Sequence, residues 1–110
     1  MNILTFDIEE WYIAKLNGVT SAEVYRRYDN MLERILALLD ERGVQATFFC
    51  LGGIAREFPQ VVKRIAEAGH EIGCHSDKHH WLTKMTEAEL REDTRVAIAS
   101  LEDLTGQAVT

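Results

Sequence analysis

The chain has 110 residues, of which 46% are hydrophobic and 27% are charged, and its formal net charge is −6. This composition is typical of one ordinary globular domain. The charge argues against nucleic-acid binding, because a phosphate backbone requires a concentrated basic patch, and the lysines and arginines here never form a run. A neutral or cationic partner is favoured instead.

No stretch approaches the run of about 18 apolar residues that a membrane span requires. The first residues show no signal-peptide pattern and lead directly into a strand-like segment, so we expect a cytoplasmic protein. Cys50 and Cys74 lie in apolar segments. In that compartment two buried free thiols are favoured over a disulfide between neighbouring strands.

The first half of the chain predicts a strand, a helix and a second strand. Residues 3–8 are apolar and β-prone. Thr20 and Glu23 form a capping-box pattern that predicts the start of a helix, which should end at Gly43. Residues 44–51 are almost all apolar, which predicts a strand covered on both faces. The spacing within the helix predicts a buried stripe of Met31, Leu32, Ile35, Leu38 and Leu39.

The second half predicts two more helices around a third strand. Gly52-Gly53 predicts a break in the chain, and Pro59 should lie in the first turn of the longer part of the next helix. Residues 70–74 predict a short strand. Thr86 with Glu89 predicts the capped start of a last helix, which should end before Gly106. The predicted buried residues of these helices are Val61, Val62, Ile65, Ala66, Leu90, Ala97, Ile98, Leu101 and Leu104.

The order β-α-β-α-β-α predicts an α/β fold with a parallel sheet, either open or closed into a barrel. Three strands make a thin sheet, and residues 107–110 look like the start of a fourth strand. We therefore expect residues 1–110 to be the N-terminal part of one larger domain. An incomplete sheet would expose an apolar edge, which favours self-association.

Ionisable residues follow two of the predicted strands. Asp7, Glu9 and Glu10 follow the first, and His75 and His79 follow the third. The carboxyl ends of parallel strands lie at one rim of the sheet, where ligands bind in such folds. Two imidazoles and a carboxylate are a standard set of ligands for a catalytic divalent metal. An H-x-x-x-H pair alone is common by chance, so the hypothesis depends on the two groups meeting.

Other candidates have ordinary alternatives. His70 precedes its strand, at the end away from the rim, so a surface or satisfied core position is favoured. His80 is expected to face solvent rather than to bind the metal. Trp11 and Trp81 each flank one ionisable group, and their rings suit either a sugar face or simple packing.

Four segments of the chain resemble the polysaccharide deacetylases, also called the NodB-homology domain or carbohydrate esterase family 4. They are Thr5-Phe6-Asp7, Ala46-Thr47-Phe48-Phe49, the stretch G-H-E-I-G-C-H-S-D-K-H at 69–79, and the helix at 86–106. The resemblance implies an irregular (β/α) barrel and removal of N-acetyl groups from N-acetylhexosamine units of a poly- or oligosaccharide. It also implies a divalent metal, with zinc expected.

The resemblance assigns a role to each site residue. Asp7 is the expected general base, His75 and His79 are expected metal ligands, and Ser76 should brace the loop between them by bonding to backbone. The family's usual adjacent aspartates are replaced here by Asp7-Ile8-Glu9-Glu10. Residues two apart on a strand share a face, so Glu9 is expected to be the acidic ligand, with Glu10 as the reserve.

The family's later motifs, which include an arginine, a proline and a histidine that acts as general acid, are expected beyond Thr110. The chain alone is therefore expected to be inactive. Two alternatives stay open at this point. One is hydrolysis of an amide in a small non-sugar compound by the same fold, and the other is a non-catalytic carbohydrate-binding or structural module.

Overall fold

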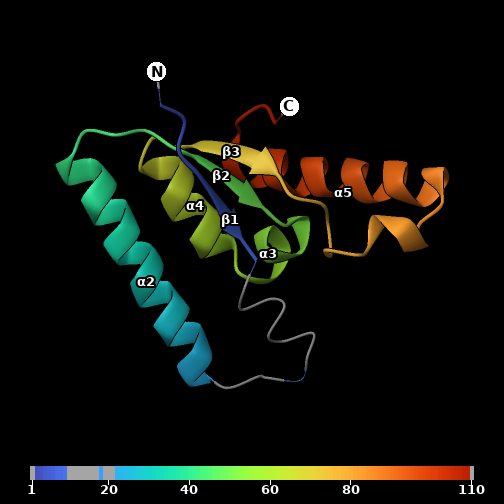
Figure 1. Cartoon of the computed structure of the whole chain (residues 1–110), viewed down its shortest axis with the longest axis horizontal. Coiled ribbons are helices and arrows are strands. Elements are labelled where there is room, and N and C mark those ends of the chain that lie inside the picture. The colour runs from blue at the N-terminus through green and yellow to red at the C-terminus, as the bar shows by residue number, and fades with distance from the viewer. Residues whose placement is uncertain (1, 10–17, 19–21, 110) are drawn as a thin grey trace.

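The computed structural model describes residues 2–9, 18 and 22–109, and these form a three-stranded sheet with helices packed against it (Figure 1). The strands are β1 (Thr5–Ile8), β2 (Thr47–Cys50) and β3 (Glu71–Cys74), in that order, and both neighbouring pairs are parallel. The helices are α2 (Ala22–Glu41), α3 (Gly52–Glu57), α4 (Pro59–Glu67) and α5 (Glu87–Thr105), with a short 3-10 helix, η1 (Leu82–Lys84), before α5. The predicted order of elements and the parallel sheet are confirmed.

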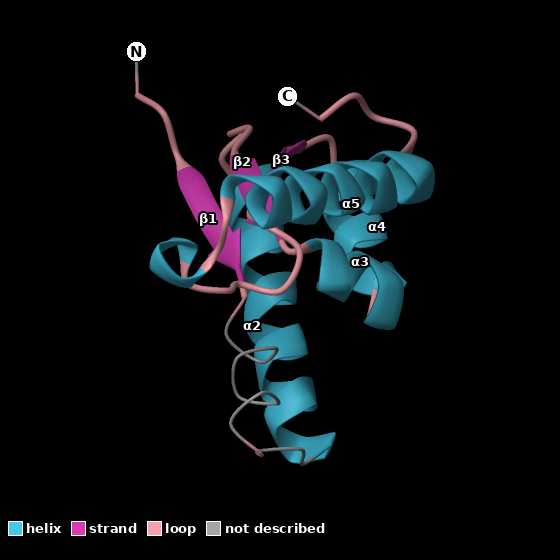
Figure 2. Ribbon diagram, turned by 90° about the vertical axis from the view of Figure 1, so that its right-hand side faces the viewer, coloured by secondary structure: helices cyan, strands magenta, loops and turns pink. Residues whose placement is uncertain are grey.

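The two faces of the sheet differ in their cover, because α3, α4 and α5 all lie on one side of it (Figure 2). Phe48 and Cys50 of β2 point to the helices and are fully buried, whereas Thr47 and Phe49 point to the other side and are half-buried. The prediction that this strand is covered on both faces was wrong. An apolar run in a strand does not determine how many of its faces are covered, because that depends on where the helices of the fold pack. We call the less covered side the open face.

The strands are shorter than the sequence predicts because pairing limits them. Thr5 is the first residue of β1 to pair with β2, where its partner is Thr47, and the N–H of Thr47 donates to the carbonyl of Leu4 at 3.1 Å. Ile3 lies beyond this point and is 81% exposed. Ile3 therefore stays exposed although it is apolar, because it lies outside the paired part of the strand.

Helix α2 buries a narrower stripe than its spacing predicts. Leu32 and Leu39 are buried and Ile35 is half-buried, but Met31 is 49% and Leu38 is 53% exposed, so these two predictions were wrong. Met31 and Leu38 lie at the edges of this stripe. The helix contacts the rest of the protein only along the middle of its apolar face, so the residues at the edges stay exposed. The predicted cap at Thr20 lies outside the described residues.

Gly52-Gly53 does not break the chain as predicted; it forms the first turn of α3. A side chain at Gly52 has no room, because an added Cβ would lie 2.6 Å from the Cα of Ala97 and would also meet the Asp77 carboxylate. The glycine thus permits a close approach of α3 to α5. Pro59 occupies the first turn of α4, as predicted.

Helix α5 begins and ends where the sequence predicts. The N–H and the hydroxyl of Thr86 donate to the Glu89 carboxylate at 2.7 and 2.8 Å, and these bonds hold the pKa of Glu89 below its usual value. Gly106 ends the helix with a φ of 70°. Ala97 and Leu101 are fully buried as predicted, whereas Leu90, at 37% exposed, is not. Leu90 lies in the first turns of the helix, beyond the buried residues that contact the core.

Residues 107–109 form no strand, so the predicted fourth strand is not present in this part of the chain. Val109 is nevertheless buried, and its N–H donates to the Glu102 carboxylate at 2.9 Å. Self-association through a sheet edge stays a prediction.

Among the described residues, none of the helices combines the length and the hydrophobicity that crossing a bilayer needs.

Gly73 gives the first test of this packing. Its neighbour in β2 is Phe49, and a Cβ at Gly73 would lie 2.5 Å from Cδ1 and 2.7 Å from Cε1 of that ring. Gly73→Ala should therefore lower the free energy of unfolding by about 1–3 kcal/mol, as overpacking typically does. Urea denaturation of the intact protein measures this, and an unchanged unfolding midpoint would show that the Phe49 ring moves away freely.

Candidate metal and catalytic site

The register of the sheet brings the ends of β1 and β3 to the same level. Ile8, Cys50 and Cys74 are partners across the three strands, and the N–H of His75 continues the ladder by donating to the carbonyl of Cys50 at 3.0 Å. Glu9 and His75 are thus the next residues on the two outer strands. Glu9 lies two residues after Asp7, so both carboxylates project toward the open face.

The side chains of Glu9, His75 and His79 converge on one point. Oε2 of Glu9 lies 2.5 Å from Nε2 of His75 and 2.7 Å from Nε2 of His79. The two imidazole rings are inclined at 64° with their centroids 5.2 Å apart. All three side chains are part-buried, and their ligand atoms lie within 4.8 Å of one another. Two neutral imidazole nitrogens and one carboxylate oxygen are a donor set that fits a divalent metal, zinc in particular.

Asp7 lies at the border of this cluster rather than inside it. Its Oδ2 is 3.9 Å from Nε2 of His75, which is too far for a hydrogen bond. The side chain is 52% exposed, whereas that of Glu9 is 21% exposed. Asp7 therefore lies beside His75, outside hydrogen-bonding distance, and more exposed than Glu9.

A tight turn carries His79 back toward β1. Ser76 and His79 both have positive φ angles, 67° and 58°, which are uncommon for residues other than glycine. The hydroxyl of Ser76 accepts a hydrogen bond from the N–H of His79 at 3.0 Å. This is the backbone bond that we predicted for Ser76.

Two histidines lie apart from the cluster. His70 is buried, its Nδ1 accepts the N–H of Ala46 at 3.3 Å, and its ring lies 5.2 Å from that of Phe48. It is thus a satisfied core residue, one of the two alternatives predicted. His80 is exposed, as predicted. Glu10, the reserve ligand, lies outside the described residues.

The two cysteines are free thiols, and burial disfavours their ionised form. Burial raises the pKa of Cys50 to about 12, and it also raises the pKa of the half-buried Cys74, next to His75. A metal ligand must be a thiolate, so neither residue suits that role.

A cleft of about 780 Å³ borders the loop that carries the histidines. Trp81, which is 73% exposed, is one of its lining residues, together with His80 and Lys84. Contact of this ring with a sugar stays one of the two predicted alternatives. Trp11, the other aromatic candidate, lies outside the described residues.

Sequence reasoning missed the groups that hold the histidine loop from behind. Asp77, between the two histidines, is only 5% exposed and forms an ion pair with Arg56 of α3. Its N–H donates to Asp93 of α5 at 2.9 Å. In the sequence, an acidic residue inside an H-x-x-x-H motif is expected to face solvent. The one signal for the burial of Asp77 was Gly52, whose missing side chain allows the loop to approach α3.

The chain matches a known protein family and several curated proteins. The family described as "Polysaccharide deacetylase" matches residues 3–110 of the chain. A peptidoglycan-N-acetylglucosamine deacetylase from Bacillus cereus is 37% identical over 106 residues, covering 92% of this chain and 38% of that protein. A chitooligosaccharide deacetylase from Rhizobium leguminosarum is 32% identical over 80 residues, covering 69% of this chain and 37% of that protein.

Among solved structures, a pseudoenzyme of carbohydrate esterase family 4 from Bacillus anthracis has a TM-score of 0.75 at 27% identity. The alignment covers 97% of this chain and 32% of that one. The fold is thus the N-terminal part of the family's (β/α) barrel. The chain spans less than half the length of these matched proteins. Since the family match extends over residues 3–110, the chain belongs to the polysaccharide deacetylase family.

Proposed function

We propose that the protein carrying this chain is a metal-dependent hydrolase that removes N-acetyl groups from N-acetylhexosamine units of a poly- or oligosaccharide. The observation that carries the proposal is the meeting of Glu9, His75 and His79, with both Nε2 atoms within 2.7 Å of one carboxylate oxygen. The names of the relatives, which refer to N-acetylglucosamine in peptidoglycan and to chitooligosaccharide, support the substrate class.

Glu9, His75 and His79 are the residues proposed to hold the metal, with zinc expected from the donor set. When bound, such an ion polarises the acetamide carbonyl and lowers the pKa of a water molecule. The two histidines come from a loop braced by hydrogen bonds, and Glu9 directly follows a strand. A hydrogen-bonded loop and the end of a strand thus position the three donors, as a catalytic site requires.

Asp7 is the proposed general base. It lies beside His75 without contacting it directly, and its exposed carboxylate can take the proton of the attacking water on the open face. Asp7 and Glu9 thus share one face but differ in burial and in contacts. This difference separates the base from the ligand.

Two other functions remain as second candidates. A non-catalytic role is favoured by the likeness to the Bacillus anthracis pseudoenzyme. Against it, Asp7, Glu9, His75 and His79 are all present here and lie together. Amide hydrolysis on a small non-sugar substrate would use the same four residues.

A cytoplasmic location also stays a prediction, to be tested by fractionating the producing cell.

Removing the metal tests the proposed function. Dialysis of the intact protein against a chelator should reduce acetate release from N-acetylglucosamine oligomers to background, and adding Zn²⁺ should restore it. Full activity after chelation would contradict the metal dependence. Hydrolysis of a small non-sugar amide but not of the oligomers would favour the amide hydrolase. Tight zinc binding without any hydrolysis would favour the non-catalytic role.

A further inference from the structure

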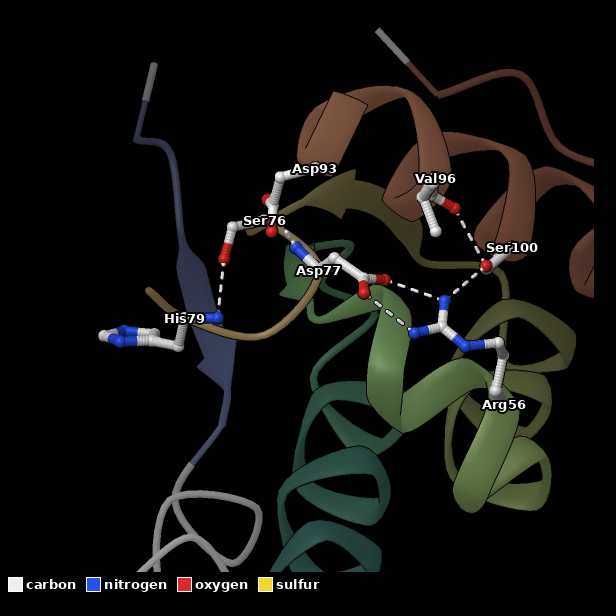
Figure 3. Close-up of polar contacts among 7 residues, drawn as sticks. All are labelled: Arg56, Ser76, Asp77, His79, Asp93, Val96 and Ser100. Carbon is white, nitrogen blue, oxygen red and sulfur yellow. Dashed lines mark hydrogen bonds and ion pairs between the residues drawn. The ribbon is translucent and has the colours of Figure 1, made fainter. Parts of the chain in front are cut away.

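Asp77 is an acidic residue buried in the middle of the turn that joins the two histidines. Its side chain is only 6% exposed. A carboxylate buried this far is costly unless it is paired and hydrogen-bonded. Arg56 pairs with it through both arms of the guanidinium: Nη1 donates to Oδ1 at 2.7 Å and Nη2 donates to Oδ2 at 2.8 Å (Figure 3). Such a two-bond pair fixes direction as well as distance.

The guanidinium of Arg56 is itself held between two helices. Arg56 projects from α3, and its Nη1 also donates to the hydroxyl of Ser100 on α5 at 2.7 Å. That hydroxyl donates in turn to the carbonyl of Val96 at 2.8 Å, so its position is fixed by the helix backbone. The Asp77 carboxylate is therefore anchored to both helices through one arginine.

The backbone of the turn is tied to the same two helices. The N–H of Asp77 donates to the Asp93 carboxylate of α5 at 2.9 Å. From the start of α3, the N–H of Gly53 donates to the carbonyl of Asp77 at 2.9 Å, and that of Gly52 donates to the carbonyl of Ser76 at 3.0 Å. Every polar group of Asp77 thus has a partner in a helix.

These contacts matter because the turn is not a relaxed one. Ser76 and His79, on either side of Asp77 and Lys78, both have positive φ angles. This conformation is unfavourable for a residue with a Cβ, and it persists where the surrounding contacts hold it in place. In Figure 3 the His79 ring points to the side of β1, and the Asp77 carboxylate points the opposite way, toward Arg56.

We propose that Arg56 and Asp93 are positioning residues for the metal site. By holding Asp77 from behind, they keep the 75–79 turn in the conformation in which His79 meets His75 and Glu9. The inference rests on the proposed function, because it assumes that these three residues bind a metal. It assigns to Arg56 on α3 and Asp93 on α5 a role through the histidine turn rather than as metal ligands.

The first test is Arg56→Gln in the intact protein. This change leaves the buried Asp77 carboxylate without its cation, so the turn should lose its fixed shape. The affinity for Zn²⁺, measured by calorimetric titration of the metal-free protein, should fall about 10- to 100-fold, as is typical when a residue that supports metal ligands is removed. Arg56→Lys should give an intermediate loss, because an ammonium cannot form the same two-bond pair.

Arg64→Gln is the matched control. Arg64 of α4 forms an ion pair with Asp29 of α2, and its side chain is 34% exposed against 42% for Arg56. Neither Arg64 nor Asp29 belongs to the histidine turn. This variant should lower the melting temperature of the metal-free protein and leave the zinc affinity unchanged. The comparison separates positioning of the turn from a general loss of stability.

A double variant adds a readout that loss of stability alone would not produce. When Arg56→Gln is combined with Asp77→Asn, the protein no longer buries the Asp77 charge, and the two new side-chain amides can hydrogen-bond to each other. Its loss of zinc affinity should be smaller than the product of the two single losses, which is the sign of direct coupling. Independent losses that simply multiply would count against the proposal.

Equal zinc affinity in the unmodified protein, Arg56→Gln and Arg56→Lys would overturn the positioning role alone. If Arg56→Gln does not fold, Arg56→Lys and Asp93→Asn decide the matter by the same titration, and wild-type affinity in both would overturn the role. An unmodified protein that binds no Zn²⁺ would overturn this proposal and the proposed function together.

Discussion

Asp7→Asn should lower the rate of deacetylation by about 10²–10⁴-fold, the usual contribution of a general base, while zinc affinity stays near its original value. The reason is the position of Asp7. Its carboxylate lies 3.9 Å from His75, outside hydrogen-bonding distance, and is half exposed, whereas Glu9 contacts both histidines. An amide of the same size keeps the shape of the site but cannot accept the proton.

Acetate release from chitin oligomers, measured alongside the zinc content of the same sample, tests this prediction. Asp103→Asn is a suitable control, since Asp103 is an exposed acid on α5 and should lose neither quantity. Near-normal turnover in Asp7→Asn would show that another group is the base. Loss of zinc together with activity would instead make Asp7 a ligand.

The elements with local signals were predictable from the sequence. A capping box at Thr86 and a glycine at Gly106 specify the two ends of α5, because each satisfies backbone groups of its own helix. The alternation of faces along β1 likewise predicted that Glu9 would lie beside Asp7. Both features depend only on residues a few positions apart.

Features that depend on distant partners were not predictable in this way. The spacing of Met31 and Leu38 marks a helical face, but the width of the contact with the sheet decides which residues of that face are covered. Gly52 looks like a break, although its actual constraint is the approach of Ala97, 45 positions later. The pairing of Arg56 with Asp77 is of the same kind, because the fold brings together charges that a single sequence shows as separate.

His75→Ala and His79→Ala should each lose zinc and activity together, which is the opposite pattern to Asp7→Asn. Removing either ring leaves one imidazole and the Glu9 carboxylate, and two protein ligands rarely hold a divalent ion well. Zinc content should therefore fall from about one equivalent to near zero. Glu9→Gln should follow the same pattern, since an amide is a poor substitute for a carboxylate that lies 2.5 and 2.7 Å from the two Nε2 atoms.

His80→Ala provides the matched control for this series, because His80 is adjacent to His79 in the chain but is exposed and lies outside the cluster. It should keep both zinc and turnover. Elemental analysis of each purified variant, combined with circular dichroism to verify its fold, gives the result. If His79→Ala retains a full equivalent of zinc while His80→Ala loses it, the metal is bound by a different pair of histidines, and the convergence on Glu9 has another purpose.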